Sequence, residues 1–189
     1  MSRALVLSAF LAFTALGLSG VASAQVTHTP QQPYAHLHSR PIKALSDQQI
    51  ADLRAGRGMR YALPAELNGY PGPLHTLENA DALRLSPAQR ERTKALFEAM
   101  KAEAVPLGER LIQQEAELER LFAERAVTPA SLEAATSAIG VTQGVLRAAH
   151  LRYHLAMMEV LTPEQVQRYA EARGYGGELG QEGHSGHSH

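Results

Sequence analysis

Helix-start signals divide this chain into segments. The most complete of them is Leu161–Gln165. Thr162 can cap the helix, Pro163 suits the first helical position, and Gln165 can accept a hydrogen bond from the backbone N–H of the cap. Each such signal predicts the start of a helix. The same signal recurs at Leu85–Gln89, more loosely at Leu45–Gln49, and in part at Val127–Pro129.

Long stretches with helical periodicity lie between these signals. Apolar residues recur at steps of three and four from residue 87 to about 124, and charged residues fill the remaining face, which predicts a long amphipathic helix. A second helix is predicted from 129 to about 158 and a third from 163 to 173. No segment shows the strand period of two. The fold is therefore predicted to be all-α: a long helical hairpin with shorter flanking helices at 47–55, 60–67 and 74–83, and disordered termini.

The N-terminal 24 residues have the pattern of a secretory signal peptide. Arg3 is followed by an apolar run from Ala4 to Leu18, and residues 22–24 form a small-residue cleavage site. An uncleaved anchor is the alternative, but the run is short of the roughly 20 apolar residues that a membrane span needs. We expect cleavage after Ala24 and export of the chain. A flexible arm is expected over residues 25–44, followed by a single helical domain over 45–177 with its core at 75–175.

The absence of cysteine and the near-balance of charge limit how the chain can be stabilised and what it can bind. The chain has no cysteine, so neither disulfides nor a cysteine-linked lipid anchor can hold it. Its 18 basic and 19 acidic residues nearly balance, which gives no indication of a nucleic-acid or anionic-membrane partner. Stability is expected to come from a helical core or from association between chains.

No catalytic arrangement can be assembled from the residues. The sequence contains no phosphate-binding glycine loop at a helix start, no His-Glu-x-x-His zinc helix and no Gly-x-Ser-x-Gly elbow. The glutamates lie on charged helical faces, which are usually solvated. The chain is therefore predicted not to be an enzyme and to require no cofactor, and the residues before about 80 carry no chemistry that the sequence identifies.

Two histidine groups are candidate metal sites. His150, His154 and Met158 follow one another at four-residue steps and are expected along one edge of a helix. Imidazole suits Zn, Cu, Ni or Co, and a thioether favours copper(I) or serves as a weak axial ligand. Further donors would have to come from elsewhere, such as His36, His38 or a glutamate. The alternative is that these histidines are only packed and hydrogen-bonded beside the apolar stripe of the helix.

The second group is a histidine-rich, flexible tail at 178–189. Its three histidines alternate with small residues and could wrap around one metal ion. The alternative is a solvated tail with no more than an incidental affinity for metals. The histidines concerned are His184, His187 and His189.

The paired helix starts resemble those of the Spy/CpxP family of periplasmic proteins, whose superfamily also holds the CnrX- and ZraP-like heavy-metal sensors. The resemblance covers roughly residues 75–175. It implies a thin helical homodimer that acts as an ATP-independent chaperone and envelope-stress protein, and binds unfolded or misfolded envelope proteins on a helical surface. The motif residues that carry it are Leu85, Ser86, Gln89, Leu161, Thr162 and Gln165.

The same resemblance implies a second function, that of a periplasmic heavy-metal sensor or buffer. In the nickel and cobalt sensor branch, metal ligands lie on the helix just before the second motif, and His154 and Met158 have a similar placement here. A sensor kinase or a membrane protein is a further partner that this branch implies. The residues alone leave the choice between chaperone and sensor open.

Overall fold

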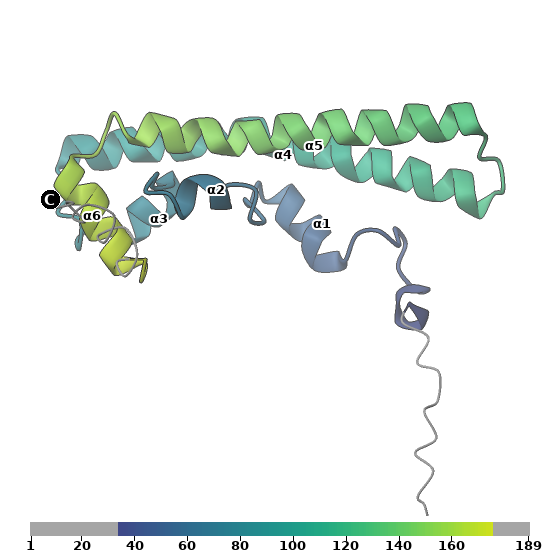
Figure 1. Ribbon diagram of the computed structural model, residues 1–189, viewed down its shortest axis with the longest axis horizontal. Helices are drawn as coiled ribbons and strands as arrows, with labels where there is room; N and C mark the ends of the chain where they lie inside the picture. Colours follow the sequence, from purple (N-terminus) through teal and green to yellow (C-terminus); the bar gives the residue numbers. More distant parts are fainter. Residues whose placement is uncertain (1–33, 176–189) are drawn as a thin grey trace, which may run out of the picture. The chain divides into compact units, whose positions relative to one another are not determined.

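The computed structural model describes residues 34–175, and their secondary structure is entirely helical (Figure 1). Residues 36–175 belong to one compact unit that holds all six described α-helices. No described helix is long and apolar enough to cross a membrane. The elements are η1 Ala35–Leu37, α1 Asp47–Arg54, α2 Leu63–Glu66, α3 Pro73–Glu78, α4 Pro87–Ala123, α5 Pro129–Met157 and α6 Pro163–Ala172.

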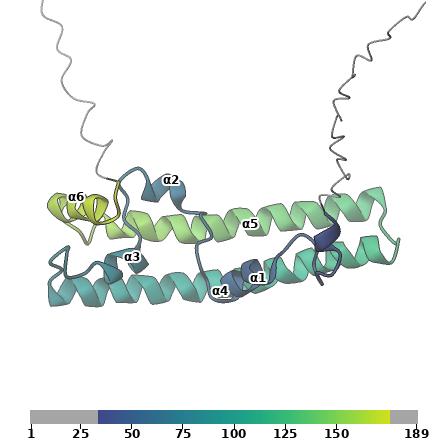
Figure 2. The ribbon, with the colours of Figure 1, turned by 90° about the horizontal axis from the view of Figure 1, so that it is seen from below.

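The expected all-α fold with a long helical hairpin is confirmed. Helices α4 and α5 run antiparallel along each other (Figure 2), and α1 to α3 lie along one side of the pair (Figure 1). Helices α1 and α3 contact α4, and α2 contacts α5. The predicted signal peptide at 1–24 and the tail at 178–189 lie outside the described residues, as do residues 25–33 of the expected arm at 25–44.

The helix starts form as the sequence predicts. Each of the four caps accepts a hydrogen bond from the backbone N–H three residues later, and that later residue bonds back to the backbone N–H of the cap. In α5 the returning group is Ser131, a position for which the sequence analysis named no partner. These caps satisfy helix N–H groups that would otherwise lack partners. The four cap residues are Ser46, Ser86, Thr128 and Thr162.

Two shorter helices differ from their expected lengths. Helix α3 ends at Glu78 rather than at 83, because Asn79 follows and its side-chain amide donates to the carbonyl of His75 at 2.8 Å. Helix α2 is limited to Leu63–Glu66. The packed region also starts earlier than residue 45, because Ile42 is buried in the core and Lys43 Nζ lies 2.7 Å from Glu119 Oε1.

Two apolar clusters hold the unit together. In the first, α1 packs on the hairpin through Leu53, Leu111 and Leu146. A Cβ atom at Gly108 would lie 2.5 Å from the carbonyl oxygen of Leu53, so glycine is needed where α1 meets α4. The second cluster lies where the start of α4 meets α6. Its buried members are Ala80, Leu83, Leu85, Met157, Val160, Leu161 and Tyr169.

Candidate functional site

Two of the predicted metal ligands on α5 are buried. His150 is 2% exposed and His154 is 7% exposed, and both line a cavity of about 540 Å³ beside the segment that contains α2 and α3. The cavity therefore brings together a long helix and residues 55–75. The sequence analysis identified no functional residues in that segment, so the part of the cavity lining that it contributes was not predicted.

A short contact with the segment before α3 fixes the orientation of His154. Its Nδ1 atom lies 2.7 Å from the carbonyl oxygen of Tyr70. Because a carbonyl can only accept, Nδ1 carries the proton, and in the neutral ring Nε2 carries the lone pair. Gly72 lies against this ring, since a Cβ atom there would be 2.7 Å from His154 Cε1. The segment from Tyr70 to Gly72 thus positions the ring of His154.

His150 has a buried nitrogen atom with no protein partner. Its Nε2 atom makes no hydrogen bond, and its ring stacks on Tyr61 with ring centroids 6.2 Å apart. Burial, and to a lesser degree the charge of His154, lower the pKa of His150 below its ordinary value. The ring is therefore neutral at pH 7, the form that can ligate a metal. A buried polar nitrogen without a protein partner is energetically unfavourable.

Glu66 is the nearest acidic side chain to His154, and other groups already engage it. Its Oε1 atom accepts a hydrogen bond from the hydroxyl of Tyr169 at 2.5 Å and lies 3.4 Å from Arg173 Nε. Its Oε2 atom is 4.0 Å from His154 Nδ1. Burial first, and then the bond to Glu66, raise the pKa of Tyr169 above its ordinary range. Glu66 therefore anchors α6 to α2 through its Oε1 atom.

The remaining cavity lining combines thioethers with positive charge. Among its residues is one acidic side chain, that of Glu66, together with four arginine and lysine side chains. Thioether sulfur is a soft ligand, which adds to the imidazole donors. The methionines of the lining are Met59 and Met100, and its basic residues are Arg57, Arg60, Lys101 and Arg173.

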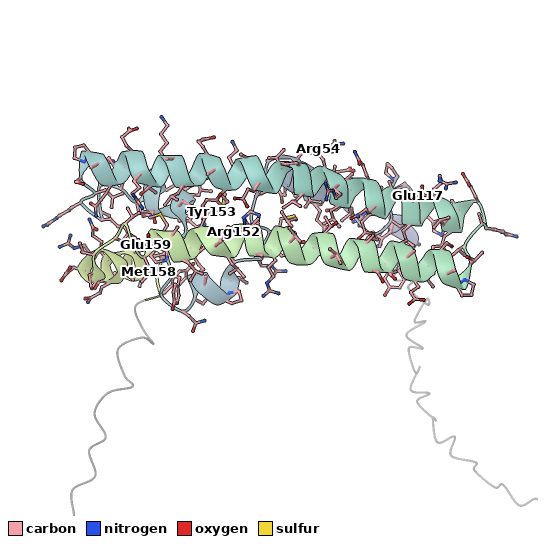
Figure 3. All side chains as sticks on the ribbon, turned by 90° about the horizontal axis from the view of Figure 1, so that it is seen from above. Arg54, Glu117, Arg152, Tyr153, Met158 and Glu159 are labelled. Carbon is pink, nitrogen blue, oxygen red and sulfur yellow. The ribbon has the colours of Figure 1, made fainter. Side chains whose placement is uncertain are left out.

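Met158 is separated from the two histidines. Its side chain is 39% exposed and does not line the cavity. A four-residue step advances about 40° beyond a full turn, so a second step carries Met158 further around the helix. Moreover, α5 ends at Met157 and Met158 is its C-cap, at the end of the helix that leads to α6 (Figure 3). Of the three ligands expected along one edge of α5, only the two histidines therefore line the cavity.

The other predicted donors do not join this site. His36 and His38 are exposed and do not line the cavity, and His184, His187 and His189 lie outside the described residues. Within residues 34–175, no group of three or more His, Cys, Asp or Glu side chains is placed to hold a metal ion. The two imidazoles nevertheless fit a metal ion in chemistry, because each offers an Nε2 atom with no protein hydrogen bond to it.

The two helix-start motifs contact each other through their glutamines and their leucines. Gln89 Nε2 donates to Gln165 Oε1 at 2.7 Å, and Gln165 Nε2 donates to Gln89 Oε1 at 3.1 Å. Leu85 and Leu161, which precede the two caps, are both buried in the second apolar cluster. The paired motifs thus form one structural unit that fixes the end of α5 relative to the start of α4, and with it the position of His154.

Comparison with known sequences identifies the family. The sequence model of the heavy-metal resistance family matches residues 64–168, which is more than half of the 189-residue chain. The chain belongs to the heavy-metal resistance family. The matched region holds both histidines of the cavity, Glu66 and both helix-start motifs, and it begins earlier than the expected residue 75. No curated protein and no solved structure matches the chain.

Proposed function

We propose that this member of the heavy-metal resistance family binds a soft or borderline metal ion in the cavity beside α5, as a sensor or buffer in the periplasm. The observation that carries the proposal is the Nε2 atom of His150, a buried and neutral imidazole nitrogen with no protein partner. Export rests on the expected signal peptide at 1–24, and a non-catalytic role is part of the same proposal.

Each cavity residue has a distinct part in this function. His150 Nε2 and His154 Nε2 supply the two imidazole donors. The Tyr70 carbonyl holds the proton of His154 on Nδ1, which keeps Nε2 free for the metal. Met59 and Met100 supply thioether sulfur from the same lining. A bound ion contributes only a Lewis-acidic centre that holds these groups together.

The charge of the lining favours an ion of low charge. Arg57, Arg60 and Lys101 line the same cavity as the histidines, and Oε1 of the Glu66 carboxylate accepts from Tyr169 and lies near Arg173. A doubly charged cation would be repelled by this lining without an anionic ligand. Imidazole and thioether donors suit copper(I), which carries one charge, so copper(I) is the first expectation and Zn, Ni or Co the alternatives.

Titration calorimetry on the mature chain tests the proposal. Copper(I), Zn and Ni are titrated into the chain, into a form that lacks residues 183–189, and into His150→Ala. We expect tight binding to survive removal of the tail and to weaken at least about 100-fold in His150→Ala, since one of two imidazole ligands is lost. His36→Ala is the matched control. Binding that is lost with the tail alone would contradict the cavity site.

A Spy/CpxP-type chaperone is the second candidate function. Exposed apolar side chains on the hairpin favour it: Leu155 is 60% exposed and Phe122 is 54% exposed. Such side chains on a helical surface suit contacts with unfolded envelope proteins. A chaperone should suppress aggregation of an unfolded client in the presence of a metal chelator. If suppression is absent under those conditions, only the metal function remains.

A further inference from the structure

The cavity that the two histidines line also carries positive charge that the described part of the chain does not balance. Two of its four basic side chains lie beside acidic partners, namely Arg57 beside Asp52 at 2.6 Å and Arg173 beside Glu66 at 3.4 Å. Arg60 and Lys101 line the same cavity, and neither forms an ion pair with any side chain of residues 34–175. Because a cleft lined by charges of one sign attracts ions of the opposite sign, this part of the cavity favours an anion.

Apolar side chains of the same lining stay partly open to solvent. Leu63 and Leu74 are each 39% exposed, and Phe97 of α4 is partly buried. Lys101 Nζ lies 5.6 Å from the centre of the Phe97 ring, so a positive charge and an apolar surface adjoin. The cavity of about 540 Å³ falls within the range of roughly 300–1,000 Å³ that is typical of sites for small organic ligands. Such sites combine apolar walls with a few charged groups.

The backbone that presents Arg60 to the cavity is in an unfavourable conformation. Met59 and Arg60 are consecutive residues with positive φ angles of 39° and 67°. Left-handed backbone at residues other than glycine is costly, and it recurs where a protein holds a ligand. A few residues earlier, Gly56 lies against α4, since a Cβ atom there would be 3.7 Å from Lys101 Cα. The segment with the strained backbone therefore brings its arginine to the cavity next to the helix that carries Lys101.

We propose that the cavity binds a small organic anion with an apolar body, of the class of a medium-chain fatty acid. Its carboxylate pairs with Arg60 and Lys101, which can donate charge-assisted hydrogen bonds to it. Its apolar body covers Leu63, Leu74 and Phe97, which removes their exposed surface from water. This site shares the cavity with the proposed metal function but does not rest on it, because neither the charge pairing nor the apolar contact involves a metal ion.

Calorimetry with matched probes tests the class of ligand. Decanoate, acetate and decyltrimethylammonium are titrated separately into the mature chain in the presence of EDTA, each below its micelle concentration. Acetate lacks the apolar body, and decyltrimethylammonium has the same alkyl chain with a positive head. We expect decanoate to bind at one equivalent and at least about tenfold more tightly than either control. Equal binding of decanoate and decyltrimethylammonium would overturn the proposal, because it would show only adsorption of alkyl chains to exposed apolar surface.

Neutral substitutions test the two cationic residues. Lys101→Gln and Arg60→Gln are each expected to weaken decanoate binding about three- to tenfold. Lys94→Gln is the control on α4, two turns before Lys101, and Arg84→Gln is the control for an arginine with positive φ, which is 51° at Arg84. Both control residues are exposed and do not line the cavity, so decanoate affinity should not change. Equal effects of the test and control substitutions would overturn the proposal.

The apolar wall and the metal function are tested with the same set of proteins. Leu74→Ala should weaken decanoate binding about threefold or more, whereas Leu132→Ala, at a leucine of similar exposure outside the cavity, should not. Lys101→Gln should keep its affinity for copper(I) or Zn, because it removes a repulsive charge and no metal donor. Loss of decanoate binding alone and loss of metal binding alone therefore identify which of the two proposals fails.

Amide NMR of the unsubstituted chain locates the bound anion without relying on the folding of any variant. Decanoate should shift the amide signals of Gly56, Gly58 and Gly72, which line the cavity. Gly140 and Gly144 of α5 serve as the internal control, because a Cβ atom at either would meet nothing within 4 Å and neither lines the cavity. Shifts confined to Gly140 and Gly144, or no shift at saturating decanoate, would overturn the proposal.

Discussion

Gln89 and Gln165 bond to each other through both of their side-chain amides, at 2.7 and 3.1 Å. Each also accepts from the backbone N–H of its own helix cap at 3.0 Å, and Gln165 Nε2 donates to the carbonyl of Leu83 at 3.2 Å. Each of these glutamines, which the sequence identifies as a local capping partner, therefore also makes a long-range contact. The two helix starts are one unit in space, although 76 residues separate the glutamines.

Removal of one of these amides should destabilise the fold. Gln165→Ala removes the side-chain partners of the Thr162 backbone N–H and of the Leu83 carbonyl, and it removes both bonds to the amide of Gln89. We therefore expect a loss of about 1–3 kcal/mol in the free energy of unfolding. Gln167→Ala is the control, because that side chain is exposed and bonds only to Glu171. Urea unfolding measures both. Equal effects of the two substitutions would show that the amide pair adds nothing beyond local helix propensity.

Gly108 and Gly144 should respond in opposite directions to alanine. At Gly108 the added methyl would meet the backbone of Leu53 at 2.5 Å, so Gly108→Ala is expected to cost about 1–3 kcal/mol of stability through overpacking. At Gly144 the methyl meets nothing, so in dilute monomeric solution Gly144→Ala should stabilise α5 by up to about 1 kcal/mol. Chemical unfolding of the two variants at the same dilution compares them. A stabilising Gly108→Ala would contradict the close contact between α1 and α4.

The buried state of His150 should make stability depend on pH. Its pKa is lowered in the folded chain, so the unfolded chain binds the proton more readily. The contribution of His150 is therefore fully present above its unfolded pKa of about 6.5, and is lost as the pH falls below that value towards the lowered folded pKa. The groups that face the ring are Tyr61, on which it stacks, and His154, whose charge adds to the effect.

Replacement of the imidazole tests this assignment. His150→Phe keeps a ring that can stack on Tyr61 and removes the titrating group. We expect the wild-type chain to lose more stability than His150→Phe between pH 7 and pH 5, as measured by urea unfolding at a series of pH values. His36→Phe, at an exposed position, should follow the wild-type profile. Parallel profiles for the wild type and His150→Phe would show that His150 titrates normally.

The hydroxyl of Tyr169 should contribute to the anchoring of α6. Tyr169→Phe removes the hydrogen bond to the buried carboxylate of Glu66, so we expect a loss of about 1–3 kcal/mol of unfolding free energy. Tyr34→Phe, at a residue that is 74% exposed, should change stability by less than about 0.5 kcal/mol. Thermal and urea unfolding measure both. Unchanged stability of Tyr169→Phe would mean that Arg173 and the hydroxyl of Tyr175 satisfy Glu66 without it.

The helices could be predicted from the sequence because their signals are local. The caps at Ser46, Ser86, Thr128 and Thr162 and the apolar periodicity each lie within a few residues of what they specify. The pairing of Gln89 with Gln165 is different, because it depends on how the hairpin closes. No spacing along the chain indicates which distant amide a capping glutamine will meet.

The candidate site was predictable only in part, for the same reason. The four-residue step from His150 to His154 placed both on one side of a helix, and the structure buries both in one cavity. The Tyr70 carbonyl and the close approach of Gly72 come from a turn-rich segment some 80 residues away. The glycines and prolines at 68–73 are typical of a turn, but no local signal indicates that this turn contacts α5. Met158 has the same four-residue spacing but does not line the cavity, because α5 ends before it.

Nitrogen NMR of the histidine rings tests the central claim most directly, because it resolves each ring nitrogen as metal is added. The chain is labelled with ¹⁵N-histidine and titrated with silver(I), as a substitute for copper(I) that does not oxidise in air, and with Zn. The account predicts that Nε2 of His150 and Nε2 of His154 shift together at one equivalent, while Nδ1 of His154 keeps its proton on the Tyr70 carbonyl. Shifts confined to His184, His187 and His189, with both cavity histidines unchanged, would contradict it.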